Sequence, residues 1–445
     1  MAIIDFKKVW DDNEADFLKL LSFNSTYDES TINKDNPCGK GIADTLNFMK
    51  EKCLELGLKV EDYDGHALSA SLGQGKRIDL VSHLDVVEPG DGWRQDPFKP
   101  IVSDKEIIAR GSQDMKSGAW LTYLALKLLK EQDIKLNKEI RLVYGSDEER
   151  TMDDMRYYIT KAGYPDFAFT PDGSFPICTG EKGALMWIIK GQYTGDIIEF
   201  QGGVQPNVIS PYAKVLVKNA DEKKALDLIK TYKYDARVEK TSNGLSIEII
   251  GKAGHASRPE HGENANVYLL HILSKLLDDK TISDIYNIFK NPYGENTDLY
   301  FDIPPMGRLT LNPGLINIKN NDIILYVDCR YPYGIKSTTL TDLLKKNLND
   351  FDISLPYDDE PTYVDDKDKY IQALKKAYSD VRKKPCPSFI SGGVSYSKVF
   401  KHCVAFGPVD VSEHMAHQKN ESILKEDLYN ALEIYYNSIL NILEI

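Results

Sequence analysis

The chain has 445 residues, of which 42% are hydrophobic and 28% are charged, and its formal net charge is −13. A chain of this length exceeds one small core and predicts two compact domains. The negative charge repels phosphate backbones and anionic membranes, which argues against a nucleic-acid partner and against a membrane partner.

The sequence also predicts where the protein works. The N-terminal segment lacks the charged and apolar regions of an export signal, and no run of about 18 apolar residues predicts a membrane span. The six cysteines lie far apart, without a CxxC pair, which is unlike the dense framework of small secreted domains. We therefore expect a cytoplasmic protein with reduced thiols.

Helices and strands alternate in the first part of the chain, as their hydrophobic periodicity indicates. Helices are expected at residues 12–23, 41–56, 117–131 and 152–162, and strands at 77–87, 140–145 and 167–170. Strands and helices in this order pack as a helix-covered sheet. The first domain is therefore predicted to be of the α/β class.

From about residue 182 the pattern changes to β-rich segments, with helices near residues 220–232 and 265–277. The acidic, proline-containing run LPYDDEPTYVDDKDKY marks the end of this region. We expect an inserted second domain at 182–366, between two parts of the first domain at 1–181 and 367–445.

Polar motifs follow the expected strands and open the helix at residue 117. They read SHLD at 82–85, GSQDMK at 111–116, SDEE at 146–149 and TPDG at 170–173. In open α/β sheets functional groups gather beyond the carboxyl ends of the strands, and each motif supplies a histidine or a carboxylate. Such donors, arriving from several strand ends, are what a hydrolytic metal pair requires.

Each motif alone also has a structural explanation. Asp114 could favour a helix N-terminus, and Asp172 could form a turn. His83 and Asp85 stand two apart on an expected strand end, so the carboxylate could orient the imidazole. The adjacent acids of SDEER could divide their roles between a metal ligand, Glu149, and a general base, Glu148.

Taken together, the motifs SHLDVV, GSQDMKSG, GSDEE, TPDGSFP, GKAGHASRPEHGENA and AHQKNE resemble those of the co-catalytic zinc peptidases. That family includes carnosinase, aminoacylase-1, succinyl-diaminopimelate desuccinylase and the PepV-type dipeptidases. The resemblance runs through essentially the whole chain. It implies a zinc-exopeptidase-like catalytic domain, with a mixed sheet and helices on both faces, and an inserted α+β lid domain.

The resemblance also implies a set of metal ligands. The bridging ligand would be Asp114, and the other ligands would be His83 and Asp172 for one metal, and Glu149 and His417 for the second. Asp85 would support His83, and Glu148 would be the general base. His414 competes with His417, but the HQxxE-like pattern favours His417. Zinc is expected, with manganese or cobalt as alternatives.

Residues of the expected lid carry further implied roles. By resemblance, His255 would hydrogen-bond the developing oxyanion, and Asn207, Arg330, Gly392 and Gly393 would bind substrate. Arg330 could instead form a structural salt bridge. After the glycine pair the segment VSYS departs from the family, whose members commonly continue with a threonine and a later arginine.

These features predict hydrolysis of dipeptides, because an aspartate at the position of Asp172 is more typical of dipeptidases than of relatives with glutamate there. An N-acyl amino acid deacylase would use the same metals and base. A non-catalytic, metal-stabilised peptide-binding protein is the alternative from another class. The long lid resembles that of PepV-type enzymes and predicts an active monomer in which His255 acts within its own chain. The resemblance further predicts a cis peptide bond after Asp114.

Overall fold

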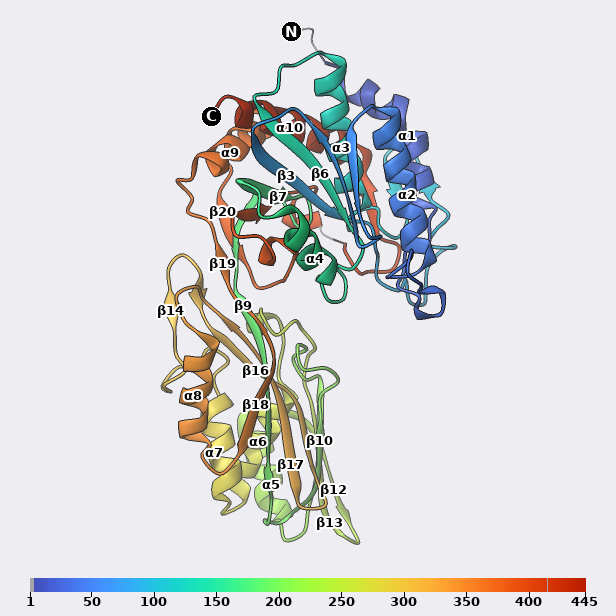
Figure 1. The fold of residues 1–445 in the computed structure, drawn as a ribbon. Coiled ribbons are helices and arrows are strands. Elements are labelled where there is room, and N and C mark those ends of the chain that lie inside the picture. Colours follow the sequence, from blue (N-terminus) through green and yellow to red (C-terminus); the bar gives the residue numbers. More distant parts are fainter. Residues whose placement is uncertain (1–3, 414) are drawn as a thin grey trace. The chain divides into compact units, whose positions relative to one another are not determined.

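The computed structural model describes residues 4–413 and 415–445, and His414 lies outside them. The chain forms two compact units (Figure 1), each with its own hydrophobic core. The first unit comprises Met1–Gly180, Tyr363–Phe389 and Val394–Ile445, and the second comprises Glu181–Thr362 with the short segment Ile390–Gly393.

The first unit is built on a mixed sheet. Its strands lie in the order β1 (Lys59–Tyr63), β2 (Ala67–Leu72), β6 (Lys138–Gly145), β3 (Lys76–His83), β7 (Phe167–Thr170), β21 (Cys403–Ala405), β8 (Ile177–Glu181) and β19 (Thr362–Tyr363), and β20 (Ser388–Ser391) pairs with β8. The central strands β6, β3, β7 and β21 run parallel. A small sheet joins β22 (Ser422–Leu424), β5 (Glu106–Ile108) and β4 (Ile101–Val102).

Helices cover both faces of the large sheet, as predicted. They are α1 (Phe6–Leu21), α2 (Lys40–Glu55), α3 (Lys116–Glu131), α4 (Asp153–Ala162), α9 (Lys369–Arg382) and α10 (Lys425–Leu443). Successive side chains of a strand point to opposite faces, so Leu80 joins the core that includes α3 and α10, whereas the next residue, Val81, packs in the core that includes α4. In the described part of the chain, short 3-10 helices lie at Glu29–Thr31, Tyr396–Lys398 and Val411–Glu413 in the first unit and at Pro259–His261 in the second.

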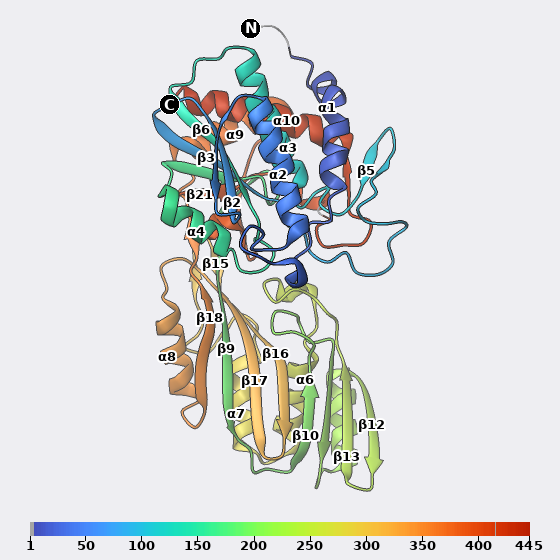
Figure 2. The ribbon, with the colours of Figure 1, turned by 45° about the vertical axis from the view of Figure 1, so that its right-hand side comes forward.

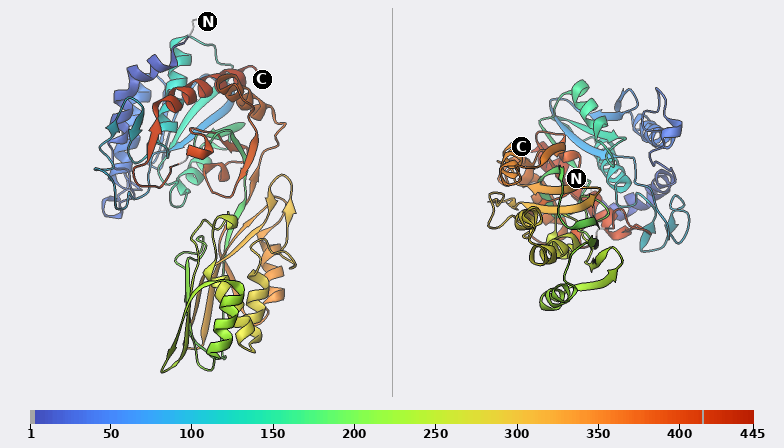
Figure 3. Two further views of the ribbon diagram at one scale, coloured as in Figure 1. Left: turned by 180° about the vertical axis from the view of Figure 1, so that it is seen from behind. Right: turned by 90° about the horizontal axis from the view of Figure 1, so that it is seen from below.

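The second unit is an antiparallel sheet with helices on one face, as Figure 2 and the left view of Figure 3 show. Its strand order is β12 (Asp235–Thr241), β13 (Gly244–Ile250), β11 (Tyr212–Val217), β10 (Ile197–Gly202), β16 (Thr310–Lys319), β17 (Asp322–Tyr331), β9 (Gly183–Gln192) and β18 (Asp352–Asp359). The helices are α5 (Glu222–Tyr232), α6 (Ala265–Leu276), α7 (Lys280–Phe289) and α8 (Ser337–Asn347), and β14 (Asp302–Ile303) pairs with β15 (Gly307–Arg308).

The largest differences from the predicted boundaries are at the start of the first helix and at the end of strand β3. The first helix begins at Phe6 instead of residue 12, because the Asp5 carboxylate caps it by accepting from the Lys8 N–H at 3.0 Å. Strand β3 ends at His83 instead of residue 87, so Asp85 lies in the following loop and not on the strand. Among the described residues, no helix is long and apolar enough to cross a bilayer.

Candidate metal centre

The sheet topology brings the motifs of the first unit together. In the parallel pair of β3 and β6, His83 lies opposite Gly145, so the loop that carries Glu148 and Glu149 begins beside His83. Strand β7 is the other neighbour of β3 and leads to Asp172. Carboxyl ends of adjacent parallel strands meet at one edge of a sheet, which is why motifs far apart in sequence converge here.

Asp114 lies between the two histidines. Its Oδ1 is 3.0 Å from Nε2 of His83, and its Oδ2 is 3.2 Å from Nε2 of His417. His417 Nε2 also lies 3.0 Å from Glu149 Oε2, and His83 Nε2 lies 3.8 Å from Asp172 Oδ2. Asp114 therefore directs one oxygen to each of two separate groups of ligands.

Asp85 orients His83 by a different atom from the one predicted. The shortest contact of His83 Nδ1 is with the backbone carbonyl of Asp85, at 2.9 Å, and the Asp85 carboxylate is farther away, at 3.4 Å. That carboxylate instead accepts the backbone N–H groups of Glu148 at 3.3 Å and Glu149 at 3.1 Å. Since Nδ1 donates to a carbonyl, the lone pair of Nε2 faces the cluster, as a metal ligand requires.

A second buried carboxylate, Asp154, holds the start of the same loop. It accepts the backbone N–H groups of Ser146 at 2.6 Å and Asp147 at 3.0 Å, and it also accepts the hydroxyl of Tyr396. Gly145 permits this packing, because a Cβ there would lie 2.0 Å from the Tyr396 hydroxyl oxygen. Tyr396 belongs to the VSYS segment, which thereby supports the loop that carries Glu148.

Burial and neighbouring charges shift the pKa values of the carboxylates in the centre. Burial, and then the charge of Asp172, raise the pKa of Glu148 well above its usual range, and burial with the charge of Asp114 raises the pKa of Glu149. Burial also acts to raise the pKa of Asp114, but hydrogen bonds from the two imidazoles hold it below its usual range. Hydrogen bonds to Asp114 and Glu149 raise the pKa of His417 to about 10.

These donors fit two divalent cations. Among the residues that the structure describes, three groups have ligand atoms within 4.8 Å of one another, namely His83 with Asp114 and Asp172, Asp114 with Glu149 and His417, and His83 with Glu148 and Glu149. Imidazole nitrogens and carboxylate oxygens are ligands of zinc and of other divalent metals, and bound cations would relieve the repulsion between the carboxylates. Because the third group includes Glu148, its carboxylate also lies close enough to other ligands to bind a cation with them.

The second unit gathers the predicted lid residues. Val208, which follows Asn207, pairs with His255, and the Ala256 N–H donates to the Asn207 carbonyl at 2.9 Å. His255 Nδ1 accepts the backbone N–H of Ser257 at 3.2 Å and lies 2.7 Å from the Ser257 hydroxyl. Because a backbone N–H can only donate, Nδ1 is the acceptor and the proton of the neutral ring is on Nε2.

Arg330 lies beside this loop with its guanidinium already engaged. It forms a two-pronged ion pair with Asp328, at 3.0 and 2.8 Å, and its Nη1 donates to the Gly392 carbonyl at 3.0 Å. Gly392 also approaches Ser257, because a Cβ on it would lie 2.4 Å from the Ser257 Cβ. Desolvation and the Arg330 charge lower the pKa of His255, which favours its neutral form. The structure thus contains the structural salt bridge that was the alternative for Arg330.

Glu421 is a residue of the centre that sequence reasoning left without a role. Its fully buried carboxylate accepts the N–H groups of Gln113 at 2.7 Å, Asp114 at 3.1 Å and Gly111 at 3.1 Å, and pairs with Arg110 at 2.8 Å. The sequence did contain a signal for Glu421, since it is the last residue of the AHQKNE motif.

The predicted cis peptide bond after Asp114 is confirmed.

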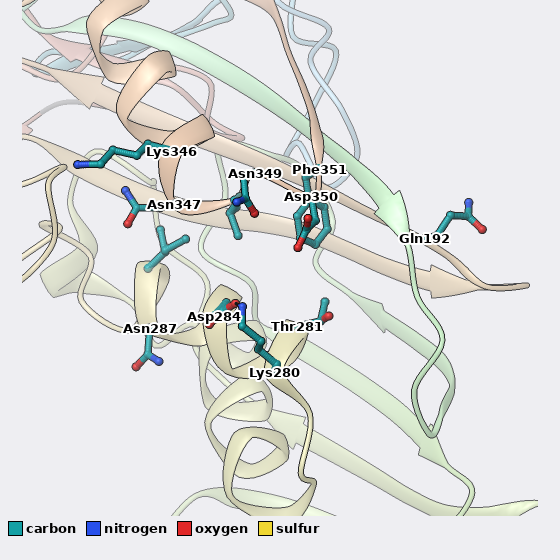
Figure 4. Close-up of a pocket in the computed structure, with 12 residues that line it drawn as sticks. Gln192, Lys280, Thr281, Asp284, Asn287, Lys346, Asn347, Asn349, Asp350 and Phe351 are labelled. Carbon is teal, nitrogen blue, oxygen red and sulfur yellow. Dashed lines mark hydrogen bonds and ion pairs between the residues drawn. The ribbon is translucent and has the colours of Figure 1, made fainter.

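A separate cavity of about 410 Å³ lies in the second unit, between α7 and the segment that follows α8 (Figure 4). Its lining is mostly polar and includes the ion pair of Lys280 and Asp284, with Asn287 and Asn347 nearby. It contains none of the predicted site residues, so the candidate centre remains the cluster around Asp114.

Comparison with known proteins agrees with this geometry. The model of "Peptidase family M20/M25/M40" matches residues 80–441. A Staphylococcus epidermidis protein named "Putative dipeptidase" is 32% identical over 451 residues, covering 95% of each chain. The crystal structure of human carnosine dipeptidase 1 has a TM-score of 0.60 at 13% identity, covering 100% of both chains. Dug1p of Saccharomyces cerevisiae has a TM-score of 0.60 at 14% identity, covering 99% of this chain and 98% of its own.

The two solved structures show that the fold is shared. The family match covers most of the chain, from the strand that ends at His83 to the last helix. We conclude that the chain belongs to peptidase family M20/M25/M40 and is a metallopeptidase.

Proposed function

We propose that this peptidase hydrolyses dipeptides, using two divalent metal ions. In the proposal Asp114 bridges the ions, His83 and Asp172 hold one, and Glu149 and His417 hold the other. The position of Asp114, with one carboxylate oxygen toward each histidine, is the observation that carries the proposal. The names of the staphylococcal relatives, which describe dipeptidases, support the choice of substrate.

Bound ions would polarise the scissile carbonyl and lower the pKa of a water molecule. Glu148 accepts the proton of the attacking water on its carboxylate and returns it to the leaving amine. Its place suits this work, because Glu148 Oε2 lies 4.0 Å from His83 Nε2, beside the proposed metal ligands. Asp85 holds Glu148 in place through the backbone N–H, and it also holds the ring of His83 through its own carbonyl.

His255 stabilises the developing oxyanion by donating a hydrogen bond from Nε2. The Ser257 N–H occupies Nδ1, which keeps the proton of the neutral ring on Nε2. In the proposal Asn207, Gly392 and Gly393 contact the substrate. Arg330 attracts the substrate carboxylate with the guanidinium hydrogens that Asp328 and Gly392 leave available, and it also fixes the Gly392 carbonyl.

Zinc is the proposed metal, with manganese and cobalt as alternatives, since imidazole and carboxylate donors accept all three. We further propose that the protein acts as a monomer in the cytoplasm, with small peptides as its substrates. The catalytic domain would consist of residues 1–181 and 367–445, and the lid of residues 182–366. All six cysteines are buried, which is compatible with reduced thiols.

A substrate panel tests the proposal. Metal-free protein is supplied with zinc, manganese or cobalt and given free-amine dipeptides, tripeptides, and N-acetyl and N-succinyl amino acids. We expect hydrolysis of dipeptides that a chelator abolishes and metal restores. Preference for the N-acyl compounds would instead establish a deacylase. Peptide binding without any turnover by the metal-loaded protein would establish a binding protein.

A further inference from the structure

The side chain of Gln113 links the loop before α3 to the segment that carries His417. Its Nε2 donates to the Ser422 carbonyl at 2.7 Å, and its Oε1 accepts the Met415 N–H at 2.7 Å. One buried amide therefore holds this segment on both sides of His417.

His417 depends on such support. Its side chain is 56% exposed, so burial contributes little to fixing the imidazole. Its backbone has a φ of 63°, in the left-handed region that is unfavourable for a residue with a Cβ. Without contacts that fix the segment, the imidazole would sample many positions and bind a cation less tightly.

The two segments hold each other reciprocally. The Gln113 and Asp114 N–H groups donate to the carboxylate of Glu421, and the Gln113 amide bonds the backbone on either side of His417. Gln113 immediately precedes Asp114, whose Oδ2 is 3.2 Å from His417 Nε2. The amide thus controls the separation of two ligands of the same proposed ion, whereas His83 and Asp172 come from other strand ends.

We propose that Gln113 is a positioning residue that sets the affinity of the ion held by Glu149 and His417, relative to the ion held by His83 and Asp172. The inference rests on the proposed two-metal function. Residues that orient metal ligands typically change metal affinity by about 10- to 100-fold when substituted. A purely structural role would instead weaken both ions, or the fold, to a similar extent.

The test is calorimetric titration of metal-free protein with Zn²⁺. Wild type should bind two ions. Gln113→Met, which keeps the length of the side chain without its hydrogen bonds, should weaken one ion by about 10-fold or more and the other by less than about 3-fold. Gln113→Glu keeps an acceptor for the Met415 N–H but turns a carboxylate oxygen toward the Ser422 carbonyl, which also accepts, so it too should weaken one ion more than the other.

Two controls isolate the mechanism. Gln132 also bonds across elements of the first unit, where its Oε1 accepts from the Tyr436 hydroxyl at 3.0 Å, and Gln132→Met should leave both affinities unchanged. In a His417→Ala background, Gln113→Met should change zinc binding by less than about 2-fold, because the proposed effect acts through His417. Thermal unfolding of the metal-free variants reports whether each variant is folded.

The outcomes separate this inference from the function on which it rests. Wild type that binds fewer than two ions overturns both. If wild type binds two ions and Gln113→Met binds both with unchanged affinity, or with affinities lowered by the same factor, the inference alone is overturned. If Gln113→Met does not fold, Gln113→Glu takes its place in the test. The inference is overturned if both zinc affinities of Gln113→Glu equal those of wild type, or if both are weakened by the same factor.

Discussion

Replacing Glu421 by glutamine should destabilise the first unit strongly, even with the metal removed. The substitution leaves Arg110 without its carboxylate, and their side chains are only 0% and 1% exposed. Breaking a buried ion pair costs about 3–5 kcal/mol, because the remaining charge stays desolvated. The new amide group would also face the Gly111 N–H, which is a donor. We therefore expect a loss of about 3–5 kcal/mol in the free energy of unfolding.

Urea unfolding at pH 8, with a chelator present, measures this loss. Glu61→Gln is the matched control, because Glu61 pairs with Lys59 at 2.6 Å but their side chains are 41% and 71% exposed. A partly exposed pair contributes about 1 kcal/mol or less, so the control should change little. A loss below about 1 kcal/mol for Glu421→Gln, or equal losses for both variants, would refute the reasoning.

Three further predictions concern single side chains. Glu148→Gln should lower kcat by about 10²- to 10⁴-fold while calorimetry still detects two ions, and unchanged kcat would remove Glu148 as the base. His255→Ala should lower kcat by about 10²- to 10³-fold, and mixing it with Glu148→Ala should restore no activity, whereas recovery would show that His255 acts across subunits. Burial raises the pKa of Asp79 to about 6, above about 3.9 in the unfolded chain. The folded state then binds more protons between these values, so stability is lost as pH rises from about 4 to 6, by up to about 3 kcal/mol. The free energy of unfolding of Asp79→Asn, measured in urea, should therefore rise by that amount relative to wild type between pH 4 and 7. A difference between the two proteins that does not change with pH would contradict the raised pKa of Asp79.

The convergence of the centre could be predicted because it depends on strand order and residue type. Period-two and helical patterns placed His83 on a strand end and Glu148 and Asp172 just beyond strands, and parallel pairing of β6, β3 and β7 brings such positions to one edge. Asp114 and His417 required the motif resemblance as well, since neither follows one of these central strands.

Roles that depend on backbone groups could not be predicted. Asp85 was expected to orient His83 with its carboxylate, but the carbonyl does so and the carboxylate holds the loop of Glu148. Every residue carries the same N–H and C=O groups, so no sequence pattern marks which of them a side chain will meet.

The amino-acid sequence by itself determined the α/β class of the first unit, the β-rich second unit, and the list of histidines and carboxylates. Only the tertiary structure decided that Glu421 and Gln113 hold the Asp114 loop and the His417 segment to each other. These contacts join residues about 300 positions apart. Periodicity reports the local conformation and the buried face of an element, whereas a hydrogen bond between distant segments exists only after the packing of the whole unit has placed donor and acceptor together.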